Sequence, residues 1–261
     1  MDTLELGLKG KVAIITGGSE GLGRATVERF AKSGAKVAMC ARRPDVLEAA
    51  AKEIERATGA EILAMPTDVT KQDQCDALVN AVAGRWGGVD VLLNNAGTSQ
   101  AQSFLEVTDE TWQYDFDLKV MGAIRMARLV IPSMKKRGGG AIINVTTVGG
   151  KTPAPKALPT SMTRAAGINL TKSLSKEYAA DQIRVNTICL GQVKSAQWTR
   201  RFKGGDINEY YANMAKDRGI PLGRLGEAEE FADLVAFLAS ERAKWITGTA
   251  VNFDGGASAA V

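Results

Sequence analysis

Short apolar runs alternate with longer segments of helical periodicity along almost the whole chain. The runs predict seven strands, at residues 11–15, 36–40, 62–66, 89–93, 141–145, 184–188 and 249–253. Apolar residues recur at helical spacing in the intervening segments, as in Gly23–Ser33, which Gly34 would cap, and in Pro44–Thr58. Strands separated by helices of this length are typical of βαβ units, so the pattern predicts an α/β fold with a doubly wound parallel sheet.

The whole chain, residues 1–261, is expected to form one domain. It contains no linker, internal repeat or low-complexity tract. The weakest periodicity lies in Gln192–Pro221, a polar stretch predicted to be the substrate loop. It can be a mobile lid beside a site or a plain surface insertion.

Composition narrows the range of functions. Apolar residues make up 45% of the chain and charged residues 24%, as in an ordinary soluble protein. The net charge of +4 is dispersed, and its longest basic run is Lys135–Arg137, so no nucleic-acid partner is expected. No apolar stretch is long enough for a membrane span, and there is no signal-peptide pattern. Three scattered cysteines suit a reducing compartment, so we predict a cytoplasmic protein.

The chain contains no histidine. This excludes a serine–histidine triad, histidine-based proton transfer and the commonest metal ligand, and no metal site is expected. Any chemistry must use lysine, tyrosine, carboxylates or a cofactor.

A glycine-rich turn, Thr16–Gly23, joins the first predicted strand to the first helix. Its glycines allow a sharp turn and close approach of a pyrophosphate, while the helix N-terminus offers free N–H groups. The residues expected to contact the cofactor here are Gly17, Ser19, Gly21, Leu22 and Gly23.

The turn has the spacing TGxxxGxG, and with four further motifs the chain resembles the short-chain dehydrogenase/reductase family. Those motifs are Asp68-Val69, Asn94-Asn95-Ala96-Gly97, Arg224-Leu225-Gly226, and Ile246-Thr247-Gly248 with Asp254-Gly255-Gly256. The resemblance implies a Rossmann-type dinucleotide fold. It also implies that Asp68 and Val69 meet the adenine, and that Asn95, Ala96 and Gly97 line the cofactor.

The end of the second strand indicates which cofactor binds. An acidic residue there would bond the ribose hydroxyls and repel a 2′-phosphate. Ala41 stands there instead, followed by Arg42 and Arg43, whose guanidinium groups suit a phosphate. We predict NADP(H) in preference to NAD(H), with Arg42 as the determinant. The alternative is that both arginines are solvated residues at the start of a helix. Glu20 argues slightly against NADP(H), because it stands where many NADP-preferring relatives carry a basic residue.

The catalytic positions depart from the family, which uses Asn, Ser, Tyr and Lys. Thr147 falls at the Ser position, Thr160 thirteen residues later at the Tyr position, and Arg164 at the Lys position. Counting along the preceding helix puts Lys119 at the Asn position, although a slip of one residue would place Leu118 there.

Threonine is too weak an acid to replace tyrosine as proton donor. Thr147 can still bond a carbonyl, and Arg164 keeps a positive charge by the ribose. Lys119 becomes a candidate acid or base if burial and a neighbouring cation lower its pKa. Tyr210 and Tyr211 could instead reach over the site.

In two alternative interpretations these residues have no catalytic role. Thr160 and Arg164 can merely pack on a helix, and Lys119 can extend to solvent or pair with Asp115 four residues earlier. If both cations face one cleft, their repulsion predicts either a neutral lysine or an anionic substrate.

These patterns leave three interpretations open. The first is an NADP(H)-dependent oxidoreductase of a small carbonyl or hydroxyl compound with a relocated proton donor. The second is a lyase, decarboxylase or hydrolase on the same fold, and the third is a cofactor-binding protein without turnover. The family resemblance also implies a homotetramer or homodimer, paired through helices near Trp112–Met134 and Thr163–Ala179.

Overall fold

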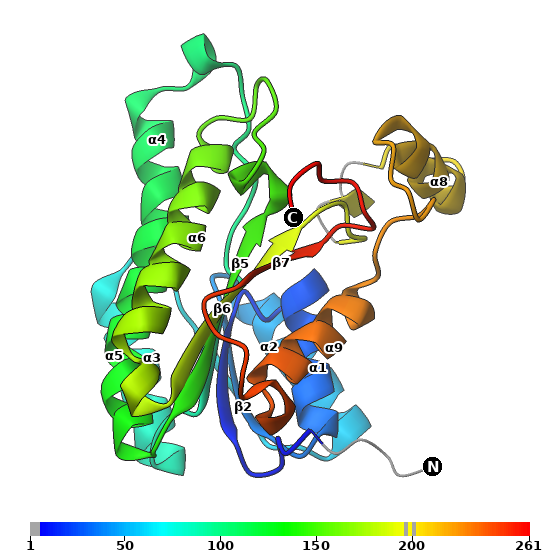
Figure 1. Cartoon of the computed structure of the whole chain (residues 1–261). Coiled ribbons are helices and arrows are strands. Elements are labelled where there is room, and N and C mark those ends of the chain that lie inside the picture. The colour runs from blue at the N-terminus through cyan, green and yellow to red at the C-terminus, as the bar shows by residue number, and fades with distance from the viewer. Residues whose placement is uncertain (1–5, 196–197, 200–201) are drawn as a thin grey trace.

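A parallel sheet forms the centre of the molecule (Figure 1). In the computed structural model, which describes residues 6–195, 198–199 and 202–261, its strand order is β3-β2-β1-β4-β5-β6-β7. The strands are β1 (Val12–Thr16), β2 (Lys36–Ala41), β3 (Ile62–Pro66), β4 (Val91–Asn94), β5 (Gly140–Thr147), β6 (Ile183–Leu190) and β7 (Ala250–Phe253). The order reverses between β1 and β4, and such switch points place ligands at the carboxyl ends of the strands.

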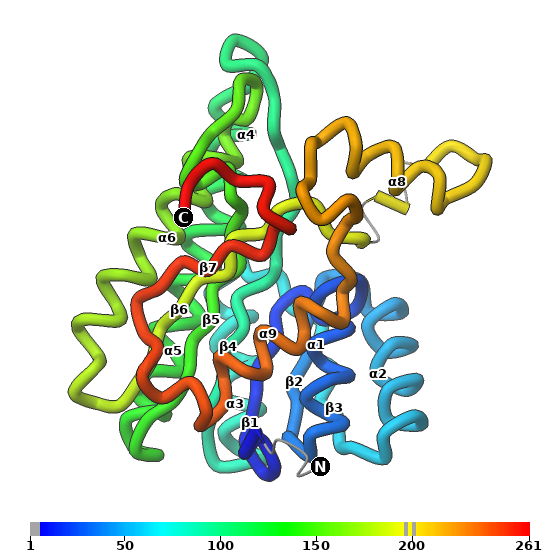
Figure 2. The backbone as a smooth tube through the Cα atoms, turned by 45° about the vertical axis from the view of Figure 1, so that its right-hand side comes forward, coloured from blue at the N-terminus to red at the C-terminus, as the bar shows by residue number. Residues whose placement is uncertain are grey.

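Helices cover both faces of the sheet. One face carries α1 (Gly21–Lys32), α2 (Pro44–Thr58) and α9 (Ala228–Ala239). The other carries α3 (Gln72–Trp86), α4 (Asp109–Phe116), α5 (Gly122–Lys136) and α6 (Thr160–Glu177). Helix α8 (Ile207–Asp217) projects from the upper edge, away from both layers (Figure 2). None of the helices in the described ranges is long and apolar enough to span a membrane.

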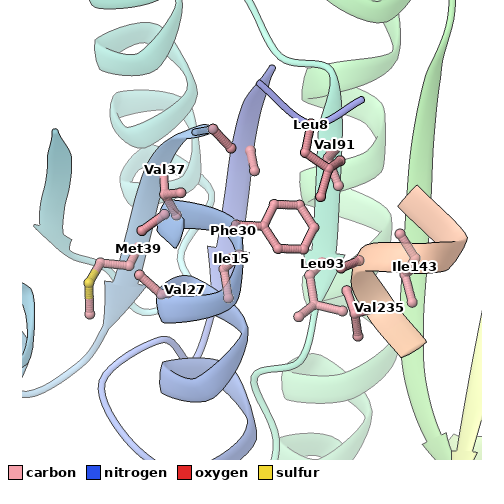
Figure 3. Close-up of a cluster of buried hydrophobic side chains, with 14 of the residues drawn as sticks. Leu8, Ile15, Val27, Phe30, Val37, Met39, Val91, Leu93, Ile143 and Val235 are labelled. Carbon is pink, nitrogen blue, oxygen red and sulfur yellow. The ribbon is translucent and has the colours of Figure 1, made fainter. Parts of the chain in front are cut away.

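Continuous apolar runs form the central strands because both faces of the sheet are buried. All five residues of β1 are buried, and they alternate between the two cores. Ala13 and Ile15 pack under α1 and α9, whereas Val12 and Ile14 pack under α3 and α5. Figure 3 shows the ring of Phe30 of α1 directed toward Val91 and Leu93 in the first of these cores.

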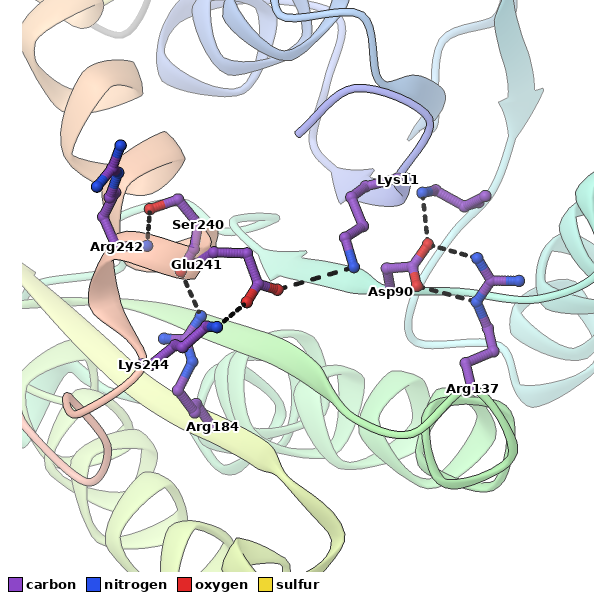
Figure 4. A network of polar contacts seen from close by, with 9 residues as sticks. Lys11, Asp90, Arg137, Arg184, Ser240, Glu241, Arg242 and Lys244 are labelled. Carbon is purple, nitrogen blue, oxygen red and sulfur yellow. Dashed lines mark hydrogen bonds and ion pairs between the residues drawn. The ribbon is translucent and has the colours of Figure 1, made fainter. Parts of the chain in front are cut away.

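The amino ends of the strands are fixed by a buried carboxylate (Figure 4). Asp90 accepts a hydrogen bond from the backbone N–H of Val12 at 2.8 Å and two from Arg137, at 2.9 and 2.8 Å. These bonds tie β1, β4 and the end of α5 together. The predicted cofactor residues lie at the opposite, carboxyl edge.

Helices α4 and α5 are joined without a loop by a π-helical turn, Asp117–Met121. The sequence predicts one helix near 112–134, and the structure extends it to Asp109–Lys136 with this turn inside it. A π-turn holds one more residue than an α-turn, and it often occurs at functional sites.

The predicted doubly wound sheet is confirmed, with strand ends that differ by up to two residues. Helices α3 and α9 were not singled out from the sequence. In the predicted substrate loop, 192–221, the structure adds α8. Tyr211, Ala215 and Ile220 of this loop form a small apolar cluster with Leu225, which follows it. Residues 196–197 and 200–201 of that loop lie outside the described ranges.

Candidate active site

The glycine turn after β1 is held against the start of the loop that follows β4. The side-chain N–H groups of Asn95 donate to the carbonyls of Thr16, at 3.0 Å, and Gly17, at 3.2 Å. The hydroxyl of Thr16 accepts from the backbone N–H groups of Asn95 and Ala96, both at 3.0 Å. Two of the predicted cofactor segments are therefore one interlocked unit.

Glycine is required at two positions of this turn. Gly17 has φ of 68°, in the left-handed region, and a Cβ there would lie 2.9 Å from Asn95. A Cβ on Gly23 would lie 2.1 Å from the carbonyl oxygen of Gly17. Because these glycines have no side chains, a ligand can approach the backbone of the turn closely.

The start of α1 suits a pyrophosphate. Glu20 is its N-cap residue, and the Glu20 side chain forms no capping hydrogen bond with the helix. The N–H groups of the first turn, Gly21–Gly23, and the helix dipole therefore point at any anion bound there. Ser19 is buried beside them.

The remaining predicted cofactor residues lie at the same edge of the sheet. Arg42 follows β2, Asp68 and Val69 follow β3, and Asn95–Gly97 follow β4. Since β3, β2, β1 and β4 are neighbours, the structure brings these segments together as the spacing predicts. The arrangement fits a dinucleotide.

Four helix side chains form a chain of polar contacts that ends at Thr160, the predicted tyrosine position. The ammonium of Lys119 contacts the carboxylate of Asp115 in a close ion pair, and both side chains are almost fully buried. Lys119 Nζ also lies 3.0 Å from the hydroxyl oxygen of Thr160. Thr163 donates to the other oxygen of Asp115 at 2.7 Å.

The hydroxyl of Thr160 accepts two hydrogen bonds. One comes from Lys119, and the other comes from the backbone N–H of Gln100 at 2.9 Å. A hydroxyl has two acceptor lone pairs and one proton. Both lone pairs are engaged and none of the described residues accepts the proton, so the proton is available to a ligand.

The surroundings of Lys119 make it a weak base. Burial and the nearby Arg164 lower the pKa of Lys119 to about 8, although Asp115 opposes the shift. Without Asp115 the two cations would repel each other strongly in this poorly solvated region. The carboxylate of Asp115 supplies the compensating anion. The repulsion between the two cations therefore does not require an anionic substrate.

Arg164 is wedged below the loop that follows β4. It donates to the carbonyl of Val145 at 2.6 Å, and a Cβ on Gly97 would lie 2.6 Å from its Nη2. Its Nε is buried without a hydrogen-bond partner among the described residues. Desolvation lowers the pKa of Arg164 to about 10, which leaves it cationic at neutral pH.

A cavity of about 20 Å³ lies between these groups, lined among others by Lys119, Asn144, Thr163 and Arg164. That volume has room for one water molecule. A ligand or water oxygen beside Arg164 would give its Nε the acceptor that the protein does not provide.

The other candidate residues have different surroundings. Thr147 ends β5 half-buried, and its hydroxyl bonds no described residue. Tyr211 is 3.3 Å from Thr199, and Tyr210 stacks with Phe202 and Tyr211 within the apolar cluster of α8. The structure therefore does not bring the two tyrosines to Thr160, and Lys119 is the ionisable donor found there.

Sequence reasoning missed part of this arrangement. It considered Asp115 only as an unremarkable partner of Lys119, and it did not identify Thr163 or the backbone N–H of Gln100. The spacing of four residues between Asp115 and Lys119 was the available signal. It indicates a pair, but it does not indicate that the pair is buried.

The comparisons with known proteins agree with this geometry. Residues 17–258 match the family model described as enoyl-(acyl carrier protein) reductase. The chain is 33% identical over 249 residues to 3-oxoacyl-[acyl-carrier-protein] reductase of Thermotoga maritima, covering 95% of this chain and 98% of the relative.

Two solved structures are similar over nearly their whole length. The L-sorbose reductase of Gluconobacter frateurii, complexed with NADPH and L-sorbose, is 37% identical with a TM-score of 0.93, covering 99% of this chain and 100% of that one. An NADPH-bound short-chain oxidoreductase of Pseudomonas aeruginosa, described as containing an atypical catalytic center, is 38% identical with a TM-score of 0.93, covering 96% and 98%. The chain therefore belongs to the short-chain dehydrogenase/reductase family of oxidoreductases.

Proposed function

We propose that this protein is an NADPH-dependent reductase of small carbonyl compounds in which Lys119 supplies the proton through the hydroxyl of Thr160. The observation that carries the proposal is the position of Lys119 Nζ, 3.0 Å from Thr160 Oγ1 and paired with Asp115 beneath it. The NADPH-bound neighbours and Arg42 after β2 support the choice of cofactor.

Bound NADPH supplies the hydride that the carbonyl carbon accepts. The first turn of α1 would hold its pyrophosphate, and Arg164 would meet the nicotinamide ribose below Gly97. As negative charge develops on the substrate oxygen, Thr160 donates its hydroxyl proton to that oxygen. Lys119 donates a proton to Thr160 Oγ1 in the same event, so threonine never carries a full negative charge.

The pKa of about 8 suits Lys119 to this role, because a catalytic acid works best when its pKa is near the operating pH. After transfer the neutral amine remains beside Asp115 and regains a proton from solvent. Thr147 contributes its free hydroxyl as a second donor to the carbonyl oxygen. The net reaction consumes one hydride and one proton for each carbonyl reduced.

The test is a screen of aldehydes, ketones, dicarbonyls and keto sugars, in which reduction is measured as the loss of NADPH absorbance. We expect Lys119→Met and Thr160→Val each to lower kcat by a hundredfold or more, on the order of a lost general acid, with NADPH affinity unchanged. Thr160→Ser keeps a hydroxyl and should retain most of the activity. Lys136→Met, on the exposed end of α5, is the matched control.

The double variant Lys119→Met/Thr160→Val tests the relay itself. Residues that act as one unit are not additive, so the double variant should be no slower than the slower single variant. Losses that multiply would contradict a shared path for the proton.

Two other functions make different predictions in the same experiments. A lyase, decarboxylase or hydrolase that uses Lys119 and Arg164 would turn over substrate without consuming NADPH. A cofactor-binding protein without turnover would bind NADPH and leave every carbonyl compound unchanged. Either result would overturn the reductase proposal.

A further inference from the structure

We infer that Tyr114 is a specificity-determining residue that holds Arg42 in place for the 2′-phosphate of NADP(H). This inference rests on the cofactor preference in the proposed function. It does not depend on the proton relay, because it concerns the adenosine end of the cleft.

A single hydrogen bond carries the inference. Arg42 Nη1 lies 2.9 Å from the hydroxyl oxygen of Tyr114, a residue 72 positions away in the chain. Arg42 extends from the end of β2, where the ribose 2′-position is expected, and Tyr114 comes from α4. The hydrogen bond therefore joins the two elements beside the expected adenosine site.

The ring of Tyr114 is held near the expected adenine site. Its ring packs against the apolar core cluster that contains Val69 and Leu118, and Leu118 lies one turn further along the same helical segment. Val69 follows β3, at the edge where the resemblance places the adenine. The phenol is therefore a rigid group, and its hydroxyl restricts a long arginine side chain.

The second arginine has a different role. Arg43 forms a close ion pair with Glu20, the residue that precedes the first turn of α1. This pairing offsets the carboxylate that would otherwise repel a 2′-phosphate. Glu20, which the sequence suggests is unfavourable to NADP, is thus compensated by the neighbour of Arg42.

The neutral character of Tyr114 is essential to the argument. Among the described residues, Arg42 makes this one hydrogen bond and no ion pair. A carboxylate partner would neutralise the guanidinium, whereas a phenol oxygen orients it and leaves its charge and its other N–H groups for a phosphate. Tyr114 therefore favours the phosphorylated cofactor by preorganising Arg42.

The experiment uses cofactor fragments, so that binding is measured without catalysis. Adenosine 2′,5′-bisphosphate carries the extra phosphate, and adenosine 5′-monophosphate lacks it. Both are titrated by calorimetry into the wild type, Tyr114→Phe, Arg42→Ala and the double variant. Tyr210→Phe, in the apolar cluster of α8, is the matched control.

We expect Tyr114→Phe to weaken binding of the bisphosphate about fivefold, the value of one ordinary hydrogen bond, and to leave the monophosphate unchanged. In the Arg42→Ala background the same substitution should have no effect. Tyr210→Phe should change neither ligand.

Each remaining outcome has a distinct meaning. Equal loss for both ligands would mean that Tyr114 serves only as a wall for the adenine, and it would overturn the inference. A wild-type preference that Tyr114→Phe does not reduce would overturn it as well. If the wild type binds both fragments equally, the NADP preference itself fails, whatever the Lys119 variants show.

Discussion

At the scale of single residues, the proposed chemistry depends on the charge balance around Lys119. Two cations share one carboxylate in a buried space, and their protonation states are linked. The pKa of Lys119 therefore reports directly on its neighbours, and this makes the proposed role measurable.

The rate of carbonyl reduction should depend on pH through Lys119. Reduction needs the protonated ammonium, and the pKa of that group is lowered to about 8. We expect kcat to be constant below pH 8 and to fall as the pH rises through that value. Oxidation of the alcohol needs the neutral amine, so its rate should rise over the same interval. A reduction rate that is flat across pH 8 would exclude Lys119 as the acid.

Replacing Arg164 should move the pH at which the reduction rate falls. Arg164 is one of the two causes that lower the pKa of Lys119, so Arg164→Gln should raise it and shift the midpoint to higher pH. The measurement is the pH profile of whatever activity remains. Arg128→Gln, an exposed substitution on α5, should leave the midpoint in place. An unchanged midpoint in Arg164→Gln would show that the two cations are not coupled.

At the scale of elements, the turn between β1 and α1 has a strict steric requirement. In Gly23→Ala the new Cβ would meet the carbonyl oxygen of Gly17, which must move and would open the turn. We expect loss of NADPH binding, measured by fluorescence titration, with retention of the helical circular dichroism signal.

The matched substitution is Gly84→Ala in α3. A Cβ there meets nothing within 4 Å, so the change should stabilise the protein by up to about 1 kcal/mol and leave NADPH affinity unchanged. Normal NADPH binding by Gly23→Ala would contradict the close packing of the turn.

The π-helical turn shows where element prediction reaches its limit. Apolar spacing identifies one long helix, but it does not locate an extra residue within it. This is why the sequence could not choose between Leu118 and Lys119 for the asparagine position. In the structure Leu118 belongs to the apolar core and Lys119 to the polar chain.

At the scale of the whole molecule, the sheet was predictable because β1, β2 and β4 are nearly continuous apolar runs. Helix α3 was less visible because small residues beside its stripe of Cys75, Leu78, Val79 and Val82, such as Ala81 and Ala83, blur the contrast between its two faces. The polar chain was less predictable still. Thr160 and Lys119 are 41 positions apart, and the packing of α6 on the π-helical turn brings them together.

Assembly is a further prediction at this scale. The apolar stripes of α5 and α6 are partly used by the core, since Ala127 and Val130 are buried within one chain. Met121, Ile124 and Ile168 are only half-covered, and Met162 is 50% exposed. We expect these helices to pair between copies, so light scattering should give a dimer or tetramer of the 27.7 kDa chain. A monomer at micromolar concentration would contradict this.

The ion pair of Asp115 and Lys119 also limits how the site can change over evolutionary time. Lys119→Asn alone would leave the buried carboxylate of Asp115 without its partner, which would lower the free energy of unfolding by about 3–5 kcal/mol. Thr160→Tyr alone would push a ring into the space that the ammonium occupies. Each single step toward the usual family residues therefore passes through a destabilised protein. The predicted departures from the family pattern are therefore expected to depend on one another, and we expect the site to be inherited, or reverted, as a set.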